Sequence, residues 1–306
     1  LMITPHGHGK NTETYAGIYL SEQERIEGEI GERNVAVQAV QNGFIAIAPT
    51  SRGFGKTRTS EDKAKDVPYS CRTLLMQDLL VGRTPIGDRV WDISKLIDWA
   101  LAELPVDKSN IIVSGNSGGG TTTLFAGACD TRISMSIPSS YFCTFTGSIG
   151  TMYHCDCNYV PGILEYGEMS DIAGLTAPRF FCTLNGKDDA MFPLKETQKA
   201  FVNLKKIYIE DLSQWLNMTE GPSFSSLKAG SRMRLEYYVG GKALENLVIP
   251  QGITRIRKSA FAYGHNIKTV TFHENIEYIE ENAFSDCDNL ELVSDKLPNY
   301  LKNIGK

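Results

Sequence analysis

One short segment of the sequence has the residue types and spacing of a catalytic serine: Gly115-Asn116-Ser117-Gly118-Gly119. The pattern Gly-x-Ser-x-Gly permits the tight strand-to-helix turn that exposes a serine hydroxyl. The segment follows the apolar run 111–113 and opens a stretch suited to a helix. Ser117 is therefore the candidate nucleophile. A plain glycine-rich loop that binds a phosphate is the competing interpretation, but neither of the usual phosphate-loop motifs is present.

A second segment, His6-Gly7-His8-Gly9, directly follows an apolar run suited to a strand. Two backbone N–H groups stabilise the oxyanion formed during acyl transfer to a serine, and one of them often comes from such a loop. We expect the N–H groups of His8 and of Gly118 to form this oxyanion hole. A metal site is the other interpretation of two close histidines, but no further ligand follows at a fitting spacing.

A third segment, 186–193, carries adjacent carboxylates after the strand-like run 180–184. A carboxylate placed there can hold a catalytic imidazole in the required tautomer and stabilise its protonated form. Asp189 is the candidate acid because the order serine then aspartate suits this arrangement, and Asp188 is the alternative. Acidic pairs in loops are otherwise usual on solvated surfaces.

The elements that must position these segments alternate along the chain up to about residue 208. Short apolar runs alternate with amphipathic stretches of helical length, which is typical of βαβ units and a mainly parallel sheet. The predicted strands are 2–4, 44–48, 110–114, 134–138 and 179–184, and the predicted helices are 33–41, 88–104, 118–128 and 195–207.

Together these features resemble the serine α/β-hydrolase superfamily, and more closely its branch of acetylxylan esterases and dienelactone hydrolase-like proteins. The resemblance covers about residues 1–208 and also rests on Pro49 with 52–55, on 82–87, on 154–159 and on 177–179. It implies a doubly wound, mainly parallel sheet and ester hydrolysis through an acyl-serine, with no metal or cofactor. It also implies that two strands precede residue 1, so we expect the chain to be truncated at its N-terminus.

The histidine of the expected triad is missing from its usual place. The resemblance implies a histidine in a loop after Asp189, yet no histidine occurs between Asp189 and Tyr263. Segment 219–225 looks like that loop without its histidine. Without a base, a serine is a poor nucleophile near neutral pH.

The other histidines offer one replacement. His6 and His8 belong to the oxyanion loop, whereas His265 and His273 lie in the C-terminal part of the chain. His154 remains as a possible replacement base, provided that its loop folds over Ser117.

The segment His154-Cys155-Asp156-Cys157 also suggests a zinc site, because imidazole and thiolate suit that ion. Three donors within four residues cannot readily surround one tetrahedral ion, and no second cysteine or histidine pair follows at the usual spacing. We therefore expect a structural loop near the pocket and no metal.

Beyond about residue 235 the alternation stops and an internal repeat begins. Ile253, Ile256, Ala260, Phe261, Asn266, Ile267 and Val270 recur as Ile276, Ile279, Ala283, Phe284, Asn289, Leu290 and Val293, each at an offset of 23. A fixed period of this length is typical of a leucine-rich solenoid, in which each unit stacks on the next. The alternating segment 233–239 is the predicted opening rung, which would shield Val248, Ile253 and Ile256 from water.

The repeats resemble the BspA-type bacterial leucine-rich repeats, whose pattern is matched by Ile249 to Phe261 and in part by Glu274 to Phe284. The final residues 304–306 look like the start of another unit, so we expect the solenoid to continue. The predicted organisation is a hydrolase domain over 1–225 and a leucine-rich repeat domain over 232–306. The repeats suggest the cell surface or secretion, while a hydrolase domain alone would also suit the cytoplasm.

Composition excludes several partners. The 36 acidic and 31 basic residues leave a formal charge of −5 with no long basic block, so nucleic acid is not expected as a partner. No run approaches the ~18 apolar residues that a membrane span requires. Seven cysteines, an odd number, do not imply a complete disulfide framework.

Two functions remain from the sequence alone. The first is a serine esterase that acts on a small ester or an acetylated carbohydrate, impaired if no histidine completes the triad. The second is a catalytically inactive hydrolase domain that carries a repeat module for binding a protein or a surface.

Overall fold

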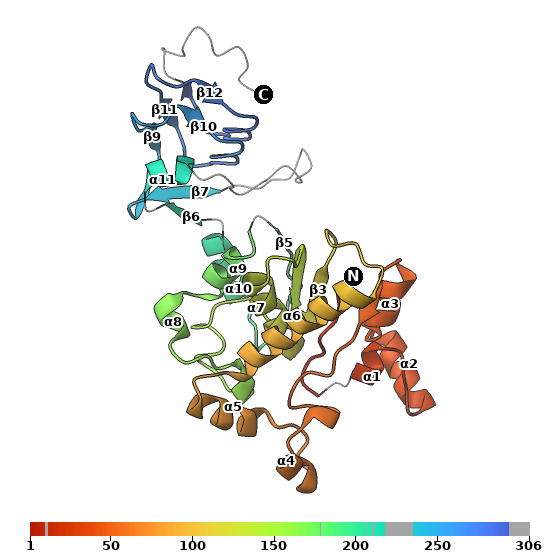
Figure 1. The fold of residues 1–306 in the computed structure, drawn as a ribbon. Helices are drawn as coiled ribbons and strands as arrows, with labels where there is room; N and C mark the ends of the chain where they lie inside the picture. The colour runs from red at the N-terminus through yellow and green to blue at the C-terminus, as the bar shows by residue number, and fades with distance from the viewer. Residues whose placement is uncertain (10–11, 178, 205, 210, 218–234, 294–306) are drawn as a thin grey trace. The chain divides into compact units, whose positions relative to one another are not determined.

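The computed structural model describes residues 1–9, 12–177, 179–204, 206–209, 211–217 and 235–293. The chain folds into two compact units that divide between Phe201 and Val202 (Figure 1). This division precedes the end of the predicted hydrolase domain at residue 225, because residues 206–209 and 211–217 pack with the repeats, as described below. The predicted linker, from about Gly221 to Ser231, lies outside the described residues.

The first unit is built on a five-stranded sheet in which every paired strand is parallel. The strands, in spatial order, are β2 (Ala46–Ile47), β1 (Met2–Ile3), β3 (Ile112–Asn116), β4 (Met135–Ser139) and β5 (Phe180–Phe181). Each overlaps a predicted strand, so the predicted parallel α/β sheet is confirmed.

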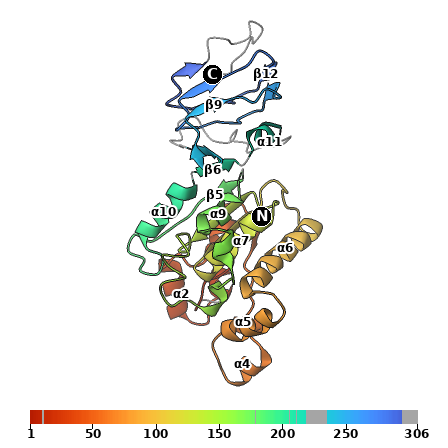
Figure 2. The same ribbon diagram turned by 90° about the vertical axis from the view of Figure 1, so that its left-hand side faces the viewer.

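Helices cover both faces of this sheet (Figure 2). The longest, α6 (Pro85–Glu103), begins where the Thr84 side chain accepts a hydrogen bond from the Gly87 N–H, with proline at its first position. Its apolar face, including Ile93 and Ile97, packs in one core with Ile3 and Val113 of the sheet. It lies beside α7 (Gly118–Cys129), which follows β3 directly, and α10 (Leu194–Leu204) packs through Phe201 against Phe142, which follows β4.

The remaining helices of the first unit are short. They are α1 (Thr12–Tyr15), α2 (Glu22–Ile30), α3 (Val35–Gln41), α4 (Ser60–Ala64), α5 (Cys71–Leu80), α8 (Ile163–Tyr166) and α9 (Met169–Gly174), with 3₁₀ turns η1 (Gly55–Thr57) and η2 (Asp156–Asn158). Most of them lie between the predicted segments, where the sequence shows no sustained helical period.

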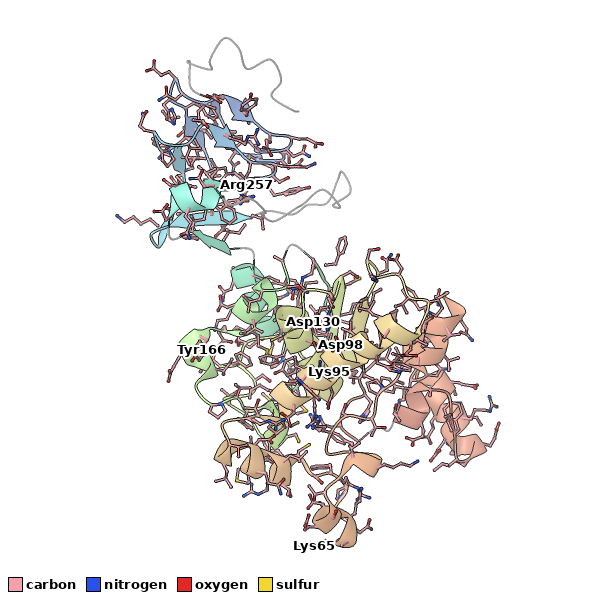
Figure 3. The ribbon with its side chains drawn as sticks, in the orientation of Figure 1. Lys65, Lys95, Asp98, Asp130, Tyr166 and Arg257 are labelled. Atoms are coloured by element: carbon pink, nitrogen blue, oxygen red, sulfur yellow. The ribbon has the colours of Figure 1, made fainter. Side chains whose placement is uncertain are left out.

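An ion-pair network joins α6 to the end of α7. Lys95 and Asp98 of α6 lie near Asp130, the residue that ends α7 (Figure 3). Arg132 connects them, because its Nη1 lies 2.5 Å from Asp98 Oδ1 and its Nη2 lies 2.6 Å from Asp130 Oδ2. The network holds the C-terminal end of α7, the helix that follows Ser117 directly.

The second unit contains the repeats, and their register confirms the period. Thr269 of β11 (Thr269–Thr271) pairs with Asn246 of β9 (Asn246–Val248) and with Leu292 of β13 (Leu292–Val293), so the paired positions are 23 apart (269 − 246 and 292 − 269). A second parallel pair joins β10 (Arg255–Ile256) to β12 (Tyr278–Ile279) with the same offset. The stacked strands enclose buried isoleucine and phenylalanine side chains.

The start of the repeat unit differs in part from the prediction. β7 (Glu236–Val239) pairs with β6 (Lys206–Ile209) and β8 (Lys242–Ala243), so the predicted helix 195–207 ends earlier and is followed by a strand. Ile253 and Ile256 are buried as predicted, but Val248 is 61% exposed and is not shielded. Strand β9 turns the side chain of Val248 away from the core because neighbouring side chains in a strand point to opposite faces.

A short helix completes this core. α11 (Leu212–Asn217) buries Leu216, and the Trp215 indole N–H donates to the Ala260 carbonyl at 3.2 Å. These contacts explain why the repeat unit begins before residue 225. Residues 233–234 and 294–306, which carry the predicted start of the rung and of a further repeat, lie outside the described residues. No described helix has the length and apolar character needed to cross a membrane.

Candidate active site

The three segments singled out in the sequence follow β1, β3 and β5, at the carboxyl ends of parallel strands. Carboxyl ends of parallel strands share one edge of a sheet, which is where ligands bind in open α/β folds. The sheet topology therefore brings the oxyanion loop, Ser117 and the Asp189 loop to the same edge.

Ser117 has a strained backbone of the kind that presents a nucleophile. Its φ of 53° and ψ of −116° lie outside the regions that residues other than glycine ordinarily occupy. The strain is held in place from both sides, because the Ser117 N–H donates to the Ser139 carbonyl at 2.9 Å and α7 begins at the next residue. Ser117 is half-buried at the start of the helix.

The glycines around Ser117 are required by close backbone contacts. A Cβ atom on Gly115 would lie 2.5 Å from the Gly119 carbonyl oxygen, and one on Gly119 would lie 2.0 Å from the Pro5 carbonyl oxygen. The turn thus closes on itself and packs against the loop after β1. This packing is the physical reason for the Gly-x-Ser-x-Gly spacing.

His8 and Gly118, the predicted oxyanion-hole residues, lie in contact. A Cβ atom on Gly118 would lie 2.5 Å from His8 Cε1, so the imidazole ring rests on the first residue of α7. Within the described part of the chain, no backbone carbonyl accepts a hydrogen bond from the N–H of either residue. Both donors are therefore free of the backbone, as an oxyanion hole requires.

His6 anchors the same loop and is not a candidate base. Its Nε2 accepts a hydrogen bond from the Ser51 N–H at 3.1 Å, and its Nδ1 lies 2.9 Å from the Gly7 carbonyl oxygen. This pairing places the proton on Nδ1, because a carbonyl can only accept. Burial lowers the pKa of His6, so the neutral form is favoured.

Asp189 organises its own loop. Its Oδ1 accepts hydrogen bonds from the N–H groups of Met191 at 2.9 Å and Phe192 at 3.1 Å. The carboxylate is half-buried. These bonds hold the side chain on the inner side of the turn that follows the β5 segment.

His154 lies beside this loop. Its Nε2 is 2.9 Å from Ser148 Oγ, and the Ser148 hydroxyl donates to the Met191 carbonyl at 2.5 Å. Because the single Ser148 proton is used in that bond, His154 Nε2 must carry the proton shared with Ser148, which leaves the lone pair on Nδ1. Burial lowers the pKa of His154, and the charge of Asp189 opposes this effect.

The charge of Asp189 thus acts on His154, but no hydrogen bond of the described residues links either side chain to Ser117. The 154–158 segment lies along α7, where the Thr121 hydroxyl donates to Asn158 Oδ1 at 2.8 Å. Among the residues that the structure describes, no hydrogen bond connects Ser117 to an imidazole. Segment 219–225, the predicted loop that lacks its histidine, lies outside those residues.

Sequence reasoning missed a cluster of sulfur atoms beside the oxyanion loop. The side chains of Cys71, Cys155 and Cys157 lie with His8 in one group, and their four donor atoms are all within 4.8 Å of one another. No short spacing in the sequence links 154–157 to Cys71 or His8, because these two residues come from distant segments. Hydrogen bonds from Cys155 and Cys71, together with the charge of Arg89, hold the pKa of the Cys157 thiol well below its usual value.

A cavity of about 460 Å³ opens beside the oxyanion loop. Its lining includes His6, Thr50, Phe54 and Tyr69, and Ser117 is not among the described residues that line it. The cavity therefore borders the oxyanion loop at His6 and Gly9 and does not enclose the serine.

Comparison with known proteins supports the predicted fold of both parts of the chain. A family model described as "BspA type Leucine rich repeat region (6 copies)" matches residues 236–306. The predicted leucine-rich repeats are confirmed by this match and by the register of their strands. No curated protein matches the chain.

Solved structures resemble the first part. A putative acetyl xylan esterase from Bacteroides fragilis aligns with a TM-score of 0.53 and 20% identity, over 66% of this chain and 55% of its own length. A CE15 glucuronoyl esterase from Teredinibacter turnerae aligns with a TM-score of 0.46 and 14% identity, over 67% of this chain and 53% of its own. The chain therefore spans about half the length of these structures.

The first of these similarities carries the conclusion about the fold. At this level of identity it shows a shared architecture, and the parallel sheet with Ser117 in a strained turn after β3 agrees with it. The predicted architecture is confirmed: an α/β-hydrolase fold followed by a leucine-rich repeat solenoid.

Proposed function

We propose that the first unit is a carboxylic ester hydrolase that acts through an acyl-Ser117 intermediate on small esters, with acetylated carbohydrate as the substrate class. The strained backbone at Ser117, next to the free N–H groups of His8 and Gly118, is the observation that carries this proposal. The substrate class is supported by the architecture shared with the putative acetyl xylan esterase.

The chemistry has two stages, and the same base accepts a proton and returns it in each. Ser117 Oγ attacks the ester carbonyl carbon while a base accepts the hydroxyl proton, and the N–H groups of His8 and Gly118 stabilise the oxyanion. The bond to the alcohol oxygen then breaks, and the alcohol leaves with that proton. Water attacks the acyl-serine with the help of the same base, which releases the carboxylic acid and restores Ser117.

His154 is the imidazole that best fits the base. It is buried, its Nδ1 retains the lone pair, and it lies within the electrostatic influence of Asp189. We assign Asp189 the role of the acid that stabilises the imidazolium. His154 must approach Ser117 when substrate binds, because catalytic hydrogen bonds often tighten only in the complex.

Hydrolysis of p-nitrophenyl acetate and labelling by a fluorophosphonate probe test the proposal. The native chain should turn over the ester slowly and be labelled at Ser117. Ser117→Ala should abolish labelling and reduce hydrolysis to the uncatalysed rate, whereas Ser109→Ala, at an exposed turn, should change neither. Labelling that survives in Ser117→Ala would show that another residue is the nucleophile.

A catalytically inactive hydrolase unit with a binding function for the repeats is the second candidate. It is favoured by the absence of a histidine between Asp189 and Tyr263 in the sequence. A folded protein that neither hydrolyses the ester nor reacts with the probe would support this function. The partner of the repeats would then be a protein or a surface.

A further inference from the structure

We infer that His8, Cys71, Cys155 and Cys157 bind one zinc ion in a four-coordinate site. This site goes beyond the proposed esterase function and does not depend on it. The four donor atoms are His8 Nε2 and the three Sγ atoms, and all lie within 4.8 Å of one another. Imidazole and thiolate are the ligands that zinc prefers, and Cys₃His is one of its usual structural sets.

The spacing of the donors fits a tetrahedral ion. With Zn–S bonds of about 2.3 Å and Zn–N bonds of about 2.0 Å, two sulfurs would lie roughly 3.8 Å apart and a sulfur and a nitrogen roughly 3.5 Å apart. The Cys155 and Cys157 sulfurs are 3.6 Å apart, and His8 Nε2 is 3.1 Å from Cys157 Sγ. Small shifts would bring the set to these distances.

The donors are held in place by separate elements. His8 lies in the loop after β1, Cys71 is the first residue of α5, and the other two cysteines flank the start of η2. Cys71 and Cys157 are fully buried. Four protein ligands leave no open position, which is the pattern of a structural ion and not of a catalytic one.

A buried charge beside the cluster supplies an independent argument. The guanidinium of Arg89 is 3% exposed, and its Nη2 lies 3.4 Å from Cys71 Sγ. Its Nε and Nη2 also donate to the Arg52 carbonyl, its guanidinium lies 5.2 Å from the centre of the Phe54 ring, and no carboxylate of the described residues forms an ion pair with it. A buried cation needs a partner of opposite charge.

The zinc site provides that charge. Three thiolates and a neutral imidazole around a divalent ion carry a net charge of −1, which balances the single positive charge of Arg89. The Arg89 contact thus fits a thiolate-ligated ion and explains why an arginine is buried against sulfur.

A disulfide is the main alternative occupant of this space. A disulfide has an S–S distance of about 2.0 Å, whereas the Cys155 and Cys157 sulfurs are 3.6 Å apart and all three cysteines are free. One disulfide would also leave a third thiol without a partner and Arg89 without a counter-charge.

The ion would act on the oxyanion loop. The His8 ring rests on Gly118, and a metal bond to His8 Nε2 would fix that ring and therefore the backbone around it. Zinc would in this way join α5, η2 and the loop after β1 into one rigid group next to Ser117.

Metal analysis of the full 306-residue chain tests the site. Protein purified without chelator and supplied with zinc should retain about one ion per chain after dialysis. Cobalt should replace zinc and give the thiolate-to-cobalt charge-transfer and strong visible absorption of a tetrahedral Co²⁺–thiolate site. Removal of the ion should lower the temperature of unfolding, and zinc should restore it.

Variants locate the site and distinguish its failure from misfolding. Cys157→Ser should lose the ion, whereas Cys129→Ser, at an exposed cysteine outside the cluster, should retain it. Arg89→Met should weaken zinc binding about 10- to 100-fold, as expected for a group outside the ligand set, and Arg89→Lys should weaken it less. If Cys157→Ser fails to fold, thiol titration of the native protein still decides, because a chelator should expose three additional reactive thiols.

Two results would overturn the inference. One is a native chain that holds no zinc or cobalt above the level found for adventitious binding and shows no change in unfolding temperature with either ion. The other is a disulfide between any two of Cys71, Cys155 and Cys157, detected by mass spectrometry of the non-reduced protein. Neither result would affect labelling of Ser117, so the esterase proposal is tested separately.

Discussion

His6 and His154 are both buried, but their hydrogen-bond partners leave different nitrogens available. The Ser51 N–H occupies Nε2 of His6, and the Gly7 carbonyl takes the proton of Nδ1, so neither nitrogen is free. In His154 the Ser148 hydroxyl oxygen accepts the Nε2 proton, and Nδ1 keeps its lone pair. His6 therefore has a structural role in the loop, whereas His154 is a candidate base.

At the residue scale, Asp189→Asn tests whether His154 and Asp189 act together. The asparagine carbonyl can still accept from Met191 and Phe192, so the loop should keep its shape while the charge is lost. We expect kcat for p-nitrophenyl acetate to fall by up to about 10⁴-fold, as in a triad that loses its carboxylate. His154→Gln should cause a comparable loss.

A matched change shows whether the effect is specific. Asp188→Asn removes a neighbouring, exposed carboxylate and should leave kcat nearly unchanged. If Asp189→Asn also left kcat unchanged in an active enzyme, His154 would not depend on this carboxylate. The assignment of Asp189 would then be wrong.

At the scale of elements, the nucleophile depends on how α7 is held at both ends. Its first turn packs against the loop after β1, and its last turn is fixed by Arg132, which joins Asp130 to Asp98 of α6. Burial opposes ionisation of Asp130, but hydrogen bonds from Arg132 and Ser94 outweigh it and hold the pKa at about 2. The ionised carboxylate is therefore part of the packing between the two helices.

Asp130→Asn should destabilise the protein by about 1.5 to 3 kcal/mol at neutral pH, because charge-assisted bonds to a buried group are lost. The folded pKa of Asp130 is below its usual 3.8, so its contribution is complete above that pH and disappears as the pH falls toward 2. The difference between native and variant in urea unfolding should shrink over the same range.

The exposed pair of Glu22 and Arg25 in α2 serves as the control for this network. Glu22→Gln should leave the unfolding midpoint nearly unchanged at every pH, because exposed pairs are screened by water. A loss as large as that of Asp130→Asn would mean that burial of the network is not what matters.

At the scale of the whole molecule, two units with separate cores share one chain. The first core lies between the parallel sheet and its helices, and the second lies inside the stacked repeats, closed by α11. The repeats alone are few, and stacked units usually need covered ends to be stable. Trp215 and Leu216 supply such a cover at one end of the repeat core.

The stability of the chain should fall between neutral and mildly acidic pH because of its buried histidines. Burial lowers the pKa values of His6 and His154 from the ordinary 6.5, so the unfolded state binds these protons more readily than the folded state. Their contribution is complete above pH 6.5 and is lost as the pH falls from there toward the lowered values. Urea unfolding at about pH 7.5 and about pH 5.5 should show the decrease.

His154→Gln should reduce this decrease, because one of the two groups no longer titrates. Equal stability of the native protein at both pH values would contradict the burial of these imidazoles in neutral form. Paired carboxylates with lowered pKa values do not mimic the effect, since they lose their contribution only at more acidic pH.

The sequence by itself determined those features that depend on neighbours along the chain. The spacing around Ser117 predicts the strained turn because glycine is needed where backbones touch, and the interval of 23 predicts the stacked strands because each repeat pairs with the next. The strands of the sheet were predictable for the same reason, since apolar runs of strand length mark buried strands.

The tertiary structure decided the contacts between distant segments. It placed His154 beside Asp189, packed residues 206–209 and 211–217 with the repeats, and gathered His8 and Cys71 around the pair Cys155 and Cys157. The order of strands in the sheet and the paths of the loops determine which distant segments meet. A local pattern of residue types does not contain that information, so the sulfur cluster became visible only in the folded chain.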